Sequence, residues 1–197
     1  MNSEANTLLK MRERLEQKVK VTIQRMATLC SSVLMRKSNM RIGFATDIHR
    51  LVEGRKLMLS GVCVPSPVGE LAHSDGDVVY HAVSEAILGA LALGDLGKFF
   101  PGTPEYKDID SSIIVKRVVA MMEENGYEIN NVDVSITLEK PKLAPFIMEM
   151  RNNLGLLLNT SLDNVSVKAG TNEGLDDIGR GLAVKADAIV MLRKKGE

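Results

Sequence analysis

The 197-residue chain has little cysteine, little histidine and no long apolar run, and each shortage excludes a class of protein. Its two cysteines, Cys30 and Cys63, are too few and too isolated for a disulfide framework, and neither belongs to a CxxC metal or redox pattern. The most apolar continuous run, residues 86–94, is far shorter than the roughly 20 residues of a membrane-spanning helix. No apolar region of a secretory signal is visible near the N-terminus. We therefore expect a soluble intracellular protein, cytoplasmic in a bacterium.

The chain also has no net charge, since 25 Lys and Arg balance 25 Asp and Glu. This balance hides an asymmetry: residues 1–40 carry eight basic and three acidic side chains, whereas the remainder carries 17 and 22. The mildly acidic remainder argues against broad nucleic-acid binding, because such binding requires Lys and Arg to neutralise phosphates. The length and the 45% hydrophobic content fit one ordinary globular domain.

Residues 1–39 show the pattern of one long amphipathic helix. Apolar residues recur every three or four positions, at Leu8, Met11, Leu15, Val19, Ile23, Met26, Cys30 and Val33. Three interpretations compete: a packing or oligomerising helix, a targeting segment for a plastid-type organelle, and upstream sequence outside the functional domain. The acidic residues of the segment weaken the targeting interpretation, because transit peptides are poor in Asp and Glu. We expect an accessory segment over 1–39 and the functional domain over 40–197.

The functional domain alternates between strand patterns and helix patterns. Strands are predicted over residues 41–49, 57–64, 131–138, 165–169 and 182–192, and helices over about 74–93, 110–125 and 141–158. Pro65, Pro67 and Gly69 predict a turn before the first of these helices. Because the elements do not follow a strict βαβ repeat, we expect an α+β fold, in which helices pack on one face of a mixed sheet.

All three histidines lie in one short region, beside several carboxylates. Asp47 and His49 are two residues apart on a predicted strand, so their side chains share one face. His81 lies on the apolar helix that follows, where an unpaired polar group is costly. One Asp and two His leave a coordination position open, which suits a catalytic zinc. The alternative is an Asp–His hydrogen bond without metal, and we favour ligation.

Two further polar clusters accompany these histidines. Residues 73–77 open a predicted helix, where N–H groups and the helix dipole favour an anion, although plain capping explains the same residues. Asp77 and His81 share one helix face, so we expect Asp77 to orient that imidazole. Residues 171–174 could hold a divalent cation and phosphate oxygens, or form no more than a turn. The residues alone predict a metal-assisted enzyme that acts on a phosphorylated small molecule.

A longer series of motifs runs through residues 40–193. It comprises Arg41-Ile42-Gly43, Asp47-Ile48-His49, residues 71–77, His81, residues 93–101, Asn131-Val132-Asp133-Val134, Pro141-Lys142, Val167-Lys168-Ala169, Thr171, Glu173 and Gly179-Arg180-Gly181. Together these motifs resemble the family of 2-C-methyl-D-erythritol 2,4-cyclodiphosphate synthases. Members commonly begin at a Met-Arg-Ile-Gly sequence, which here starts at Met40, so residues 1–39 lie outside the resemblance.

The resemblance implies a step of non-mevalonate isoprenoid biosynthesis. The 2-phosphate of 4-diphosphocytidyl-2-C-methyl-D-erythritol 2-phosphate would attack the β-phosphorus, giving the cyclic diphosphate and CMP without a protein nucleophile. The resemblance also implies a homotrimer with shared active sites, whose core is the sheet face that helices leave uncovered. Two alternatives stay open: a zinc-dependent phosphohydrolase, and a non-catalytic trimeric diphosphate-binding protein.

Family roles fall on individual residues by position. One zinc per subunit would be held by Asp47, His49 and His81, and Glu173 would hold magnesium or manganese at the substrate diphosphate. His73 and Thr171 would be the catalytic residues. Contacts to the erythritol phosphate, or in the loop over it, would come also from Ser74, Asp95, Gly97, Phe100, Gly102, Thr103 and Lys107. The cytidine diphosphate pocket would be formed by Leu138, Pro141, Lys142, Leu143 and Ala144 with Ala169 and Thr171, and further substrate contacts would come from Gly170, Asn172, Asp177 and Arg180.

The chain departs from the family pattern at a few positions. Ala45-Thr46 stands where the family usually has glycine and an aromatic residue, and Asp177 replaces an aromatic residue near the substrate. Leu182 replaces an acidic residue on the rim of the trimer axis. These changes leave the predicted metal ligands untouched and bear on substrate affinity and on any isoprenoid ligand of the axial cavity.

Overall fold

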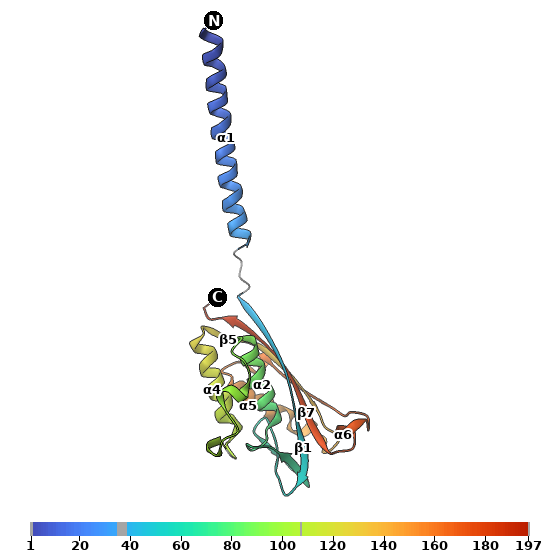
Figure 1. The fold of residues 1–197 in the computed structure, drawn as a ribbon. Coiled ribbons are helices and arrows are strands. Elements are labelled where there is room, and N and C mark those ends of the chain that lie inside the picture. The colour runs from blue at the N-terminus through green and yellow to red at the C-terminus, as the bar shows by residue number, and fades with distance from the viewer. Residues whose placement is uncertain (1, 35–38, 107, 197) are drawn as a thin grey trace. The chain divides into compact units, whose positions relative to one another are not determined.

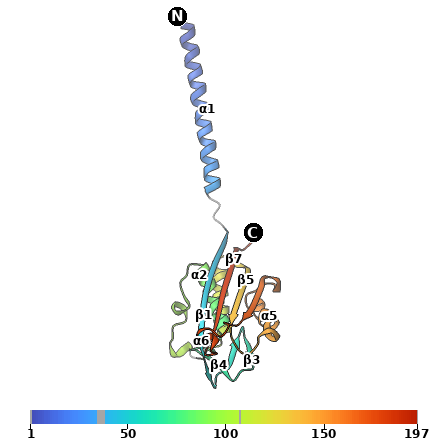
Figure 2. The same cartoon turned by 90° about the vertical axis from the view of Figure 1, so that its right-hand side faces the viewer.

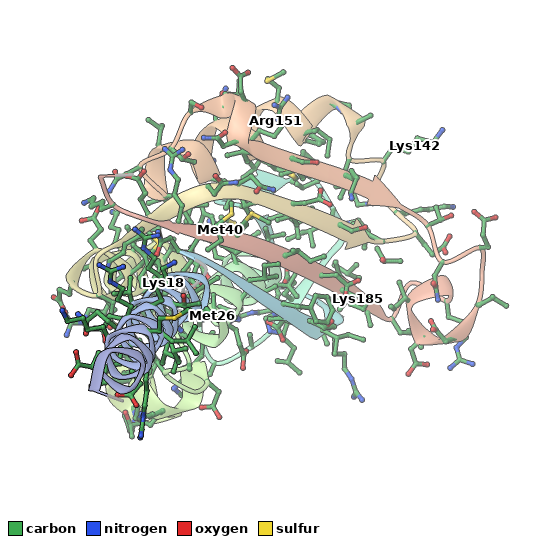
Figure 3. All side chains as sticks on the ribbon, turned by 90° about the horizontal axis from the view of Figure 1, so that it is seen from above. Lys18, Met26, Met40, Lys142, Arg151 and Lys185 are labelled. Atoms are coloured by element: carbon green, nitrogen blue, oxygen red, sulfur yellow. The ribbon has the colours of Figure 1, made fainter. Side chains whose placement is uncertain are left out.

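The computed structural model describes residues 2–34, 39–106 and 108–196, and the chain divides into two compact units, residues 1–39 and 40–197. The first unit consists of helix α1 (Asn2–Leu34). The predicted apolar stripe is exposed on it at Met11, Leu15, Val19, Ile23 and Met26. Figure 3 labels Met26 and Lys18 on this helix. The side chains of Leu8, Cys30 and Val33 lie outside the described residues.

None of the helices in the described ranges combines the length and the apolar character needed to cross a membrane.

The second unit is built on a mixed five-stranded sheet with the strand order β4-β1-β7-β5-β6 (Figure 1). The strands are β1 (Met40–Glu53), β4 (Val68–Leu71), β5 (Tyr127–Thr137), β6 (Val165–Gly170) and β7 (Ala183–Lys194). Neighbouring strands are antiparallel, except that β5 and β6 are parallel. The predicted α+β class and mixed sheet are therefore confirmed.

Three helices cover one face of this sheet: α2 (Val78–Ala90), α4 (Ser111–Glu124) and α5 (Ile147–Leu157) (Figures 1 and 2). Connecting segments contain the short helices α3 (Leu96–Phe99) and α6 (Asp176–Gly179) and the 3-10 turns η1 (Pro104–Tyr106), η2 (Ala144–Phe146) and η3 (Leu162–Asn164). Helix α2 packs directly on β1 and β7. At Gly43 of β1, a Cβ atom would come within 1.8 Å of the Ala86 carbonyl oxygen, so only glycine permits this close approach.

Successive side chains of β1 point alternately to the helix-covered face and to the uncovered face of the sheet. Gly43 and Ala45 are buried under the helices, and the side chains of Asp47 and His49 follow on the same face. The intervening residues Ile42, Phe44 and Ile48 are exposed on the opposite face, and Ile189 of β7 is exposed as well. That face, which is toward the viewer in Figure 2, carries none of the three main helices.

The structure differs from two predictions made for residues 57–71. Residues 57–64 form two short strands, β2 (Leu57–Leu59) and β3 (Val62–Val64), because Ser60 and Gly61 adopt positive φ and turn the chain back. The predicted turn around Gly69 instead contains β4, which pairs with the end of β1.

Helix α2 also begins later than predicted. Gly76 has φ of +92°, which interrupts a helix opened at Ser74, and Asp77 is the N-cap residue. Residues 74–76 therefore form a loop at the entrance of the site, and Val78 is the first helical residue.

Candidate functional site

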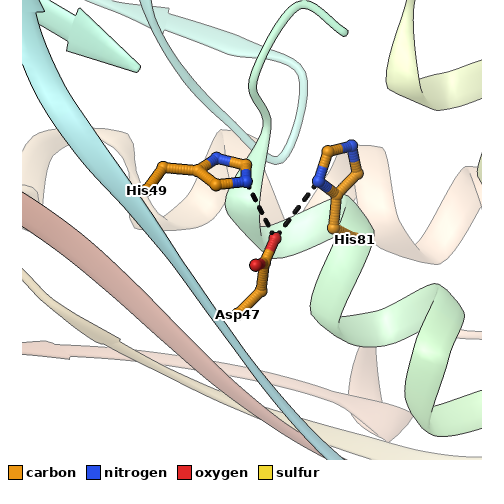
Figure 4. Close-up of side chains that lie close together, drawn as sticks. All are labelled: Asp47, His49 and His81. Atoms are coloured by element: carbon orange, nitrogen blue, oxygen red, sulfur yellow. Dashed lines mark hydrogen bonds and ion pairs between the residues drawn. The ribbon is translucent and has the colours of Figure 1, made fainter. Parts of the chain in front are cut away.

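Asp47, His49 and His81 converge under the helix-covered face of the sheet (Figure 4). Asp47 and His49 come from β1, and His81 comes from the beginning of α2. Asp47 Oδ2 lies 3.1 Å from His49 Nε2 and 3.1 Å from His81 Nδ1. One ligand atom from each residue lies within 4.8 Å of the other two, and the two imidazoles meet edge to face. The three residues form a group that could hold a metal ion.

The remaining nitrogen of each imidazole has its own partners. His49 Nδ1 lies 2.7 Å from Glu70 Oε2 and 2.7 Å from the Gly76 carbonyl oxygen. His81 Nε2 lies 3.1 Å from Ser74 Oγ and 3.0 Å from Ser111 Oγ. A proton held at these nitrogens leaves the opposite lone pairs, on His49 Nε2 and His81 Nδ1, free for a metal. The donor set and its outer partners therefore fit a zinc-type site with an open position.

Asp77 does not orient His81, contrary to the prediction from their spacing. Its fully buried carboxylate accepts hydrogen bonds of 2.6–3.1 Å from four backbone N–H groups, those of Ser60, Gly61, Val79 and Tyr80. Because an N-cap carboxylate turns toward the helix end, it joins α2 to the β2–β3 turn and does not reach the side of the helix.

Ser111 takes the role that was predicted for Asp77. Its hydroxyl donates to Asp75 Oδ1 at 2.5 Å, which leaves its oxygen to accept from His81 Nε2. The sequence contains no spacing signal for this contact, because Ser111 begins α4 and its distance from His81 depends on how the two helices pack.

The pKa values reflect a strong preference for positive charge between Asp47 and Glu70. Burial alone would raise the pKa of Asp47, but its hydrogen bonds and opposite charges with His49 and His81 hold that pKa well below its ordinary range. Burial alone would lower the pKa of His49, but the carboxylates of Asp47 and Glu70 raise it. Burial raises the pKa of Glu70 itself to about 8. The position between these carboxylates suits a proton or a metal ion.

His73 and Ser74 lie in the loop before α2, and the other residues predicted around the sugar phosphate lie in or near α3. The exposed imidazole of His73 has Nε2 2.8 Å from the carbonyl oxygen of Thr103, which brings two predicted residues together. Asp95 caps α3 by accepting from the Lys98 N–H group. Phe100 packs edge to face on Tyr106. Gly97 and Gly102 are exposed, and Lys107 lies outside the described residues.

The segments predicted to bind cytidine diphosphate meet around a pocket of about 260 Å³. Its walls are Leu138, Glu139, Pro141, Lys142, Leu143, Ala144, Ile147, Ala169, Gly170 and Thr171. Lys142 points outward from this region (Figure 3). Glu139 was not predicted: its Oε1 accepts from the backbone N–H groups of Asn172 and Gly174, which ties the pocket to the following loop.

That loop carries the predicted second metal ligand. Thr171 Oγ1 donates to Glu173 Oε1 at 2.8 Å, and both side chains are exposed. Further along, Arg180 forms an exposed ion pair with Asp177. Across the described part of one chain, no hydrogen bond or ion pair joins Thr171 or Glu173 to the Asp47, His49 and His81 group.

Known proteins resemble this chain in sequence and in fold. The chain matches the YgbB family over residues 40–193. The 2-C-methyl-D-erythritol 2,4-cyclodiphosphate synthase of Carboxydothermus hydrogenoformans is 50% identical over 155 residues, which are 78% of this chain and 95% of that protein. The synthase of Chlorobaculum parvum is 51% identical over 157 residues, 79% of this chain and 100% of that protein.

Solved structures agree with the sequence relatives. A 2C-methyl-D-erythritol-2,4-cyclodiphosphate synthase in its CDP-bound form has a TM-score of 0.72 and 38% identity, covering 77% of this chain and 99% of that one. A CDP complex of IspF from Plasmodium falciparum has a TM-score of 0.71 and 33% identity, covering 80% and 97%. With about half of the aligned residues identical to enzymes that the alignment covers almost completely, the chain belongs to the YgbB family, that of the 2-C-methyl-D-erythritol 2,4-cyclodiphosphate synthases.

Proposed function

We propose that the chain converts 4-diphosphocytidyl-2-C-methyl-D-erythritol 2-phosphate into 2-C-methyl-D-erythritol 2,4-cyclodiphosphate and CMP, in non-mevalonate isoprenoid biosynthesis. The observation that carries this proposal is the convergence of Asp47, His49 and His81 in a chain about 50% identical to synthases of that name. In the reaction, an oxygen of the 2-phosphate bonds to the β-phosphorus, and the bond from that phosphorus to the CMP oxygen breaks. Both steps occur within one substrate molecule, so no protein nucleophile is needed.

The metal that we propose for the first group is zinc, one per subunit. Asp47 would hold it through a carboxylate oxygen, His49 through Nε2 and His81 through Nδ1, since these atoms converge. A bound zinc supplies Lewis acidity and a fixed point for a phosphate oxygen of the substrate. Glu173 would hold magnesium or manganese at the diphosphate, because its exposed carboxylate adjoins the nucleotide pocket.

The other residues would act by positioning and by charge. The pocket formed by residues 138–144 and 169–171 would hold the cytidine diphosphate part, which fits the CDP complexes of two structural relatives. His73 and Thr171 present polar hydrogens that can donate to phosphate oxygens as negative charge shifts among them in the transition state. Ser74, Asp95 and Gly97 would contact the sugar phosphate. The reacting groups would thus be held in line without covalent participation of the protein.

We further propose that the active site is completed in a homotrimer, through the uncovered face of the sheet. This face exposes Ile42, Phe44, Ile48 and Ile189, an apolar surface that a second copy would remove from water. Sharing between subunits also accounts for the separation of functions in one chain, since the residues that line the nucleotide pocket do not include the zinc group. Residues 1–39 would be an accessory segment outside this assembly.

The function is tested by incubating the purified full chain with the diphosphocytidyl substrate, Zn²⁺ and Mg²⁺. We expect CMP to be released together with a cyclic diphosphate, identified by phosphorus NMR. CMP accompanied by an uncyclised product would establish the phosphohydrolase instead. A folded, zinc-loaded trimer that releases no CMP would establish the non-catalytic diphosphate-binding protein.

A further inference from the structure

Glu70 is a buried carboxylate directly behind one of the metal-binding histidines. It lies on β4, where it pairs with Leu51 of β1, two residues beyond His49. Its side chain is fully buried, and Oε2 lies 2.7 Å from His49 Nδ1 and accepts from the Val78 N–H group at 3.1 Å. Gly76 packs against it so closely that a Cβ there would lie 2.7 Å from Glu70 Cβ. This packing brings the Gly76 carbonyl and the Glu70 carboxylate to the same imidazole nitrogen.

The position is costly for a carboxylate, because a buried charge requires a compensating charge or several hydrogen bonds. Glu70 Oε1 is buried without a hydrogen-bond partner among the described residues. The nearby guanidinium of Arg55 binds the Glu70 backbone carbonyl at 3.1 Å and the Ser74 carbonyl at 2.9 Å, and does not bind the Glu70 carboxylate. Within the described ranges, His49 is the one ionisable group in an ion pair with this carboxylate.

The charge balance of the loaded site explains the carboxylate. Two neutral imidazoles, the Asp47 carboxylate and a divalent ion sum to one positive charge. A cation at this position favours the ionised form of Glu70 against the effect of burial, and the carboxylate then brings the buried cluster to neutrality. An acceptor at Nδ1 also holds the imidazole in the tautomer that keeps Nε2 free. Helix capping alone does not account for Glu70, since Asp77 already accepts from the Val79 and Tyr80 N–H groups and only the Val78 N–H group is left to Glu70.

We propose that Glu70 is a positioning residue for the metal site: it accepts a hydrogen bond from the Nδ1–H group of His49, orients Nε2 toward the metal and balances the charge of a divalent ion. This inference rests on the proposed metal-dependent function. It extends the site from three side chains to four. It also assigns a role to β4, a strand where the sequence pattern predicted a turn.

The test is the zinc affinity of the folded full chain, measured by competition with a chromogenic chelator, for the parent, Glu70→Leu and Glu70→Gln. Leucine fills the buried space but removes the charged acceptor and leaves only the Gly76 carbonyl oxygen at Nδ1, so we expect zinc binding to weaken about 10-fold. Glutamine keeps an acceptor oxygen but not the negative charge, so we expect it to recover only part of that loss. The visible spectrum of the cobalt-substituted protein should change in the leucine variant and stay close to that of the parent in the glutamine variant.

Asp77→Asn is the matched control, because Asp77 is an equally buried carboxylate seven residues away that touches only backbone N–H groups. It should lower the melting temperature and leave the zinc affinity within about twofold of the parent. A folded Glu70→Leu protein that binds zinc within twofold of the parent would overturn the proposal. Equal losses in Glu70→Leu and Asp77→Asn would also overturn it, since the effect would then belong to any buried carboxylate of this segment.

Nitrogen-15 NMR of the zinc-loaded parent keeps the proposal testable even where the leucine variant does not fold. We expect the His49 proton at Nδ1, and a proton at Nε2 would contradict the assignment. A parent chain that binds no zinc would instead refute the proposed metal site, a result distinct from unchanged affinity in the variants.

Discussion

His81 Nε2 lies 3.0 Å from the hydroxyl oxygen of Ser111, a residue thirty positions further along the chain at the start of α4. The contact connects α2 with the start of α4. Ser111 also donates to Asp75 Oδ1, so its oxygen is left to accept from His81 Nε2. Both histidines of the metal group are thus held from behind by groups on other elements, His49 by β4 and His81 by the beginning of α4.

The first prediction concerns this contact. Ser111→Ala should weaken zinc binding several-fold, and by less than the loss of a ligand, because Ser74 Oγ remains 3.1 Å from His81 Nε2. Its matched control is Ser84→Ala, since Ser84 is equally buried on α2 but its hydroxyl has no hydrogen-bond partner among the described residues. Chelator competition measures both variants. Equal zinc affinity in the two would show that the Ser111 contact does not support His81.

The second prediction separates metal binding from phosphate chemistry. His81→Ala should abolish stoichiometric zinc and CMP release while the fold is retained, because His81 is a proposed ligand near the start of α2 and is not one of the large, fully buried core side chains. His73→Ala should keep the zinc and lower turnover, since its imidazole is exposed and bonds to Thr103. Zinc content by atomic absorption and CMP release by chromatography are the two measurements. Retained zinc in His81→Ala would refute its assignment as a ligand.

Part of the candidate site could be predicted from the sequence, and part could not. Asp47 and His49 are adjacent on one face of a strand by simple alternation, and His81 lies on a helix too apolar to be anywhere but the core, so the group was predictable. Glu70 was not, because its role depends on β4 pairing with β1, and the prolines and glycine nearby favour a turn.

Local backbone geometry accounts for the other differences. Ser60 adopts a φ of +52°, which is uncommon outside glycine, so Gly61 is the one residue whose type marks the reversal between β2 and β3. Asp77 shares a helix face with His81 only if it is helical, and its extended conformation as the N-cap turns it away. The nucleotide pocket was predictable only through the family resemblance, because segments 138–144 and 169–171 meet through the pairing of β5 with β6.

The third prediction concerns the packing of α2 on the sheet. Gly43→Ala would place a methyl group 1.8 Å from the Ala86 carbonyl oxygen, so the helix that carries His81 must shift, at a cost of about 2 kcal/mol or more. Gly89→Ala, on the same helix, meets nothing within 4 Å and should stabilise the protein by about 0.5–1 kcal/mol through helix propensity. Urea denaturation gives both values. A neutral Gly43→Ala would contradict the close approach.

The fourth prediction concerns residues 1–39. Deleting them should leave the rate of CMP release and the oligomeric state unchanged, because the family match begins at residue 40 and the two units are separate. Steady-state kinetics and light scattering of the chain that starts at Met40 are the measurements. A fall in the oligomeric mass on deletion would establish the oligomerising interpretation, in which the exposed stripe at Met11, Leu15 and Val19 packs against other copies.

The fifth prediction tests the uncovered sheet face. Phe44 is 62% exposed at the centre of β1, so a carboxylate there leaves the single chain intact but opposes burial against another copy. Phe44→Asp should shift the mass measured by light scattering from three subunits toward one and should abolish CMP release, because the site would then lack its partner residues. Zinc binding should persist, since Asp47 and His49 lie on the opposite face of the strand.

Leu156→Asp is the matched control: Leu156 is 77% exposed on α5, on the helical side, and its substitution should leave both mass and turnover unchanged. Full activity from a monomeric Phe44→Asp chain would place the whole active site within one subunit.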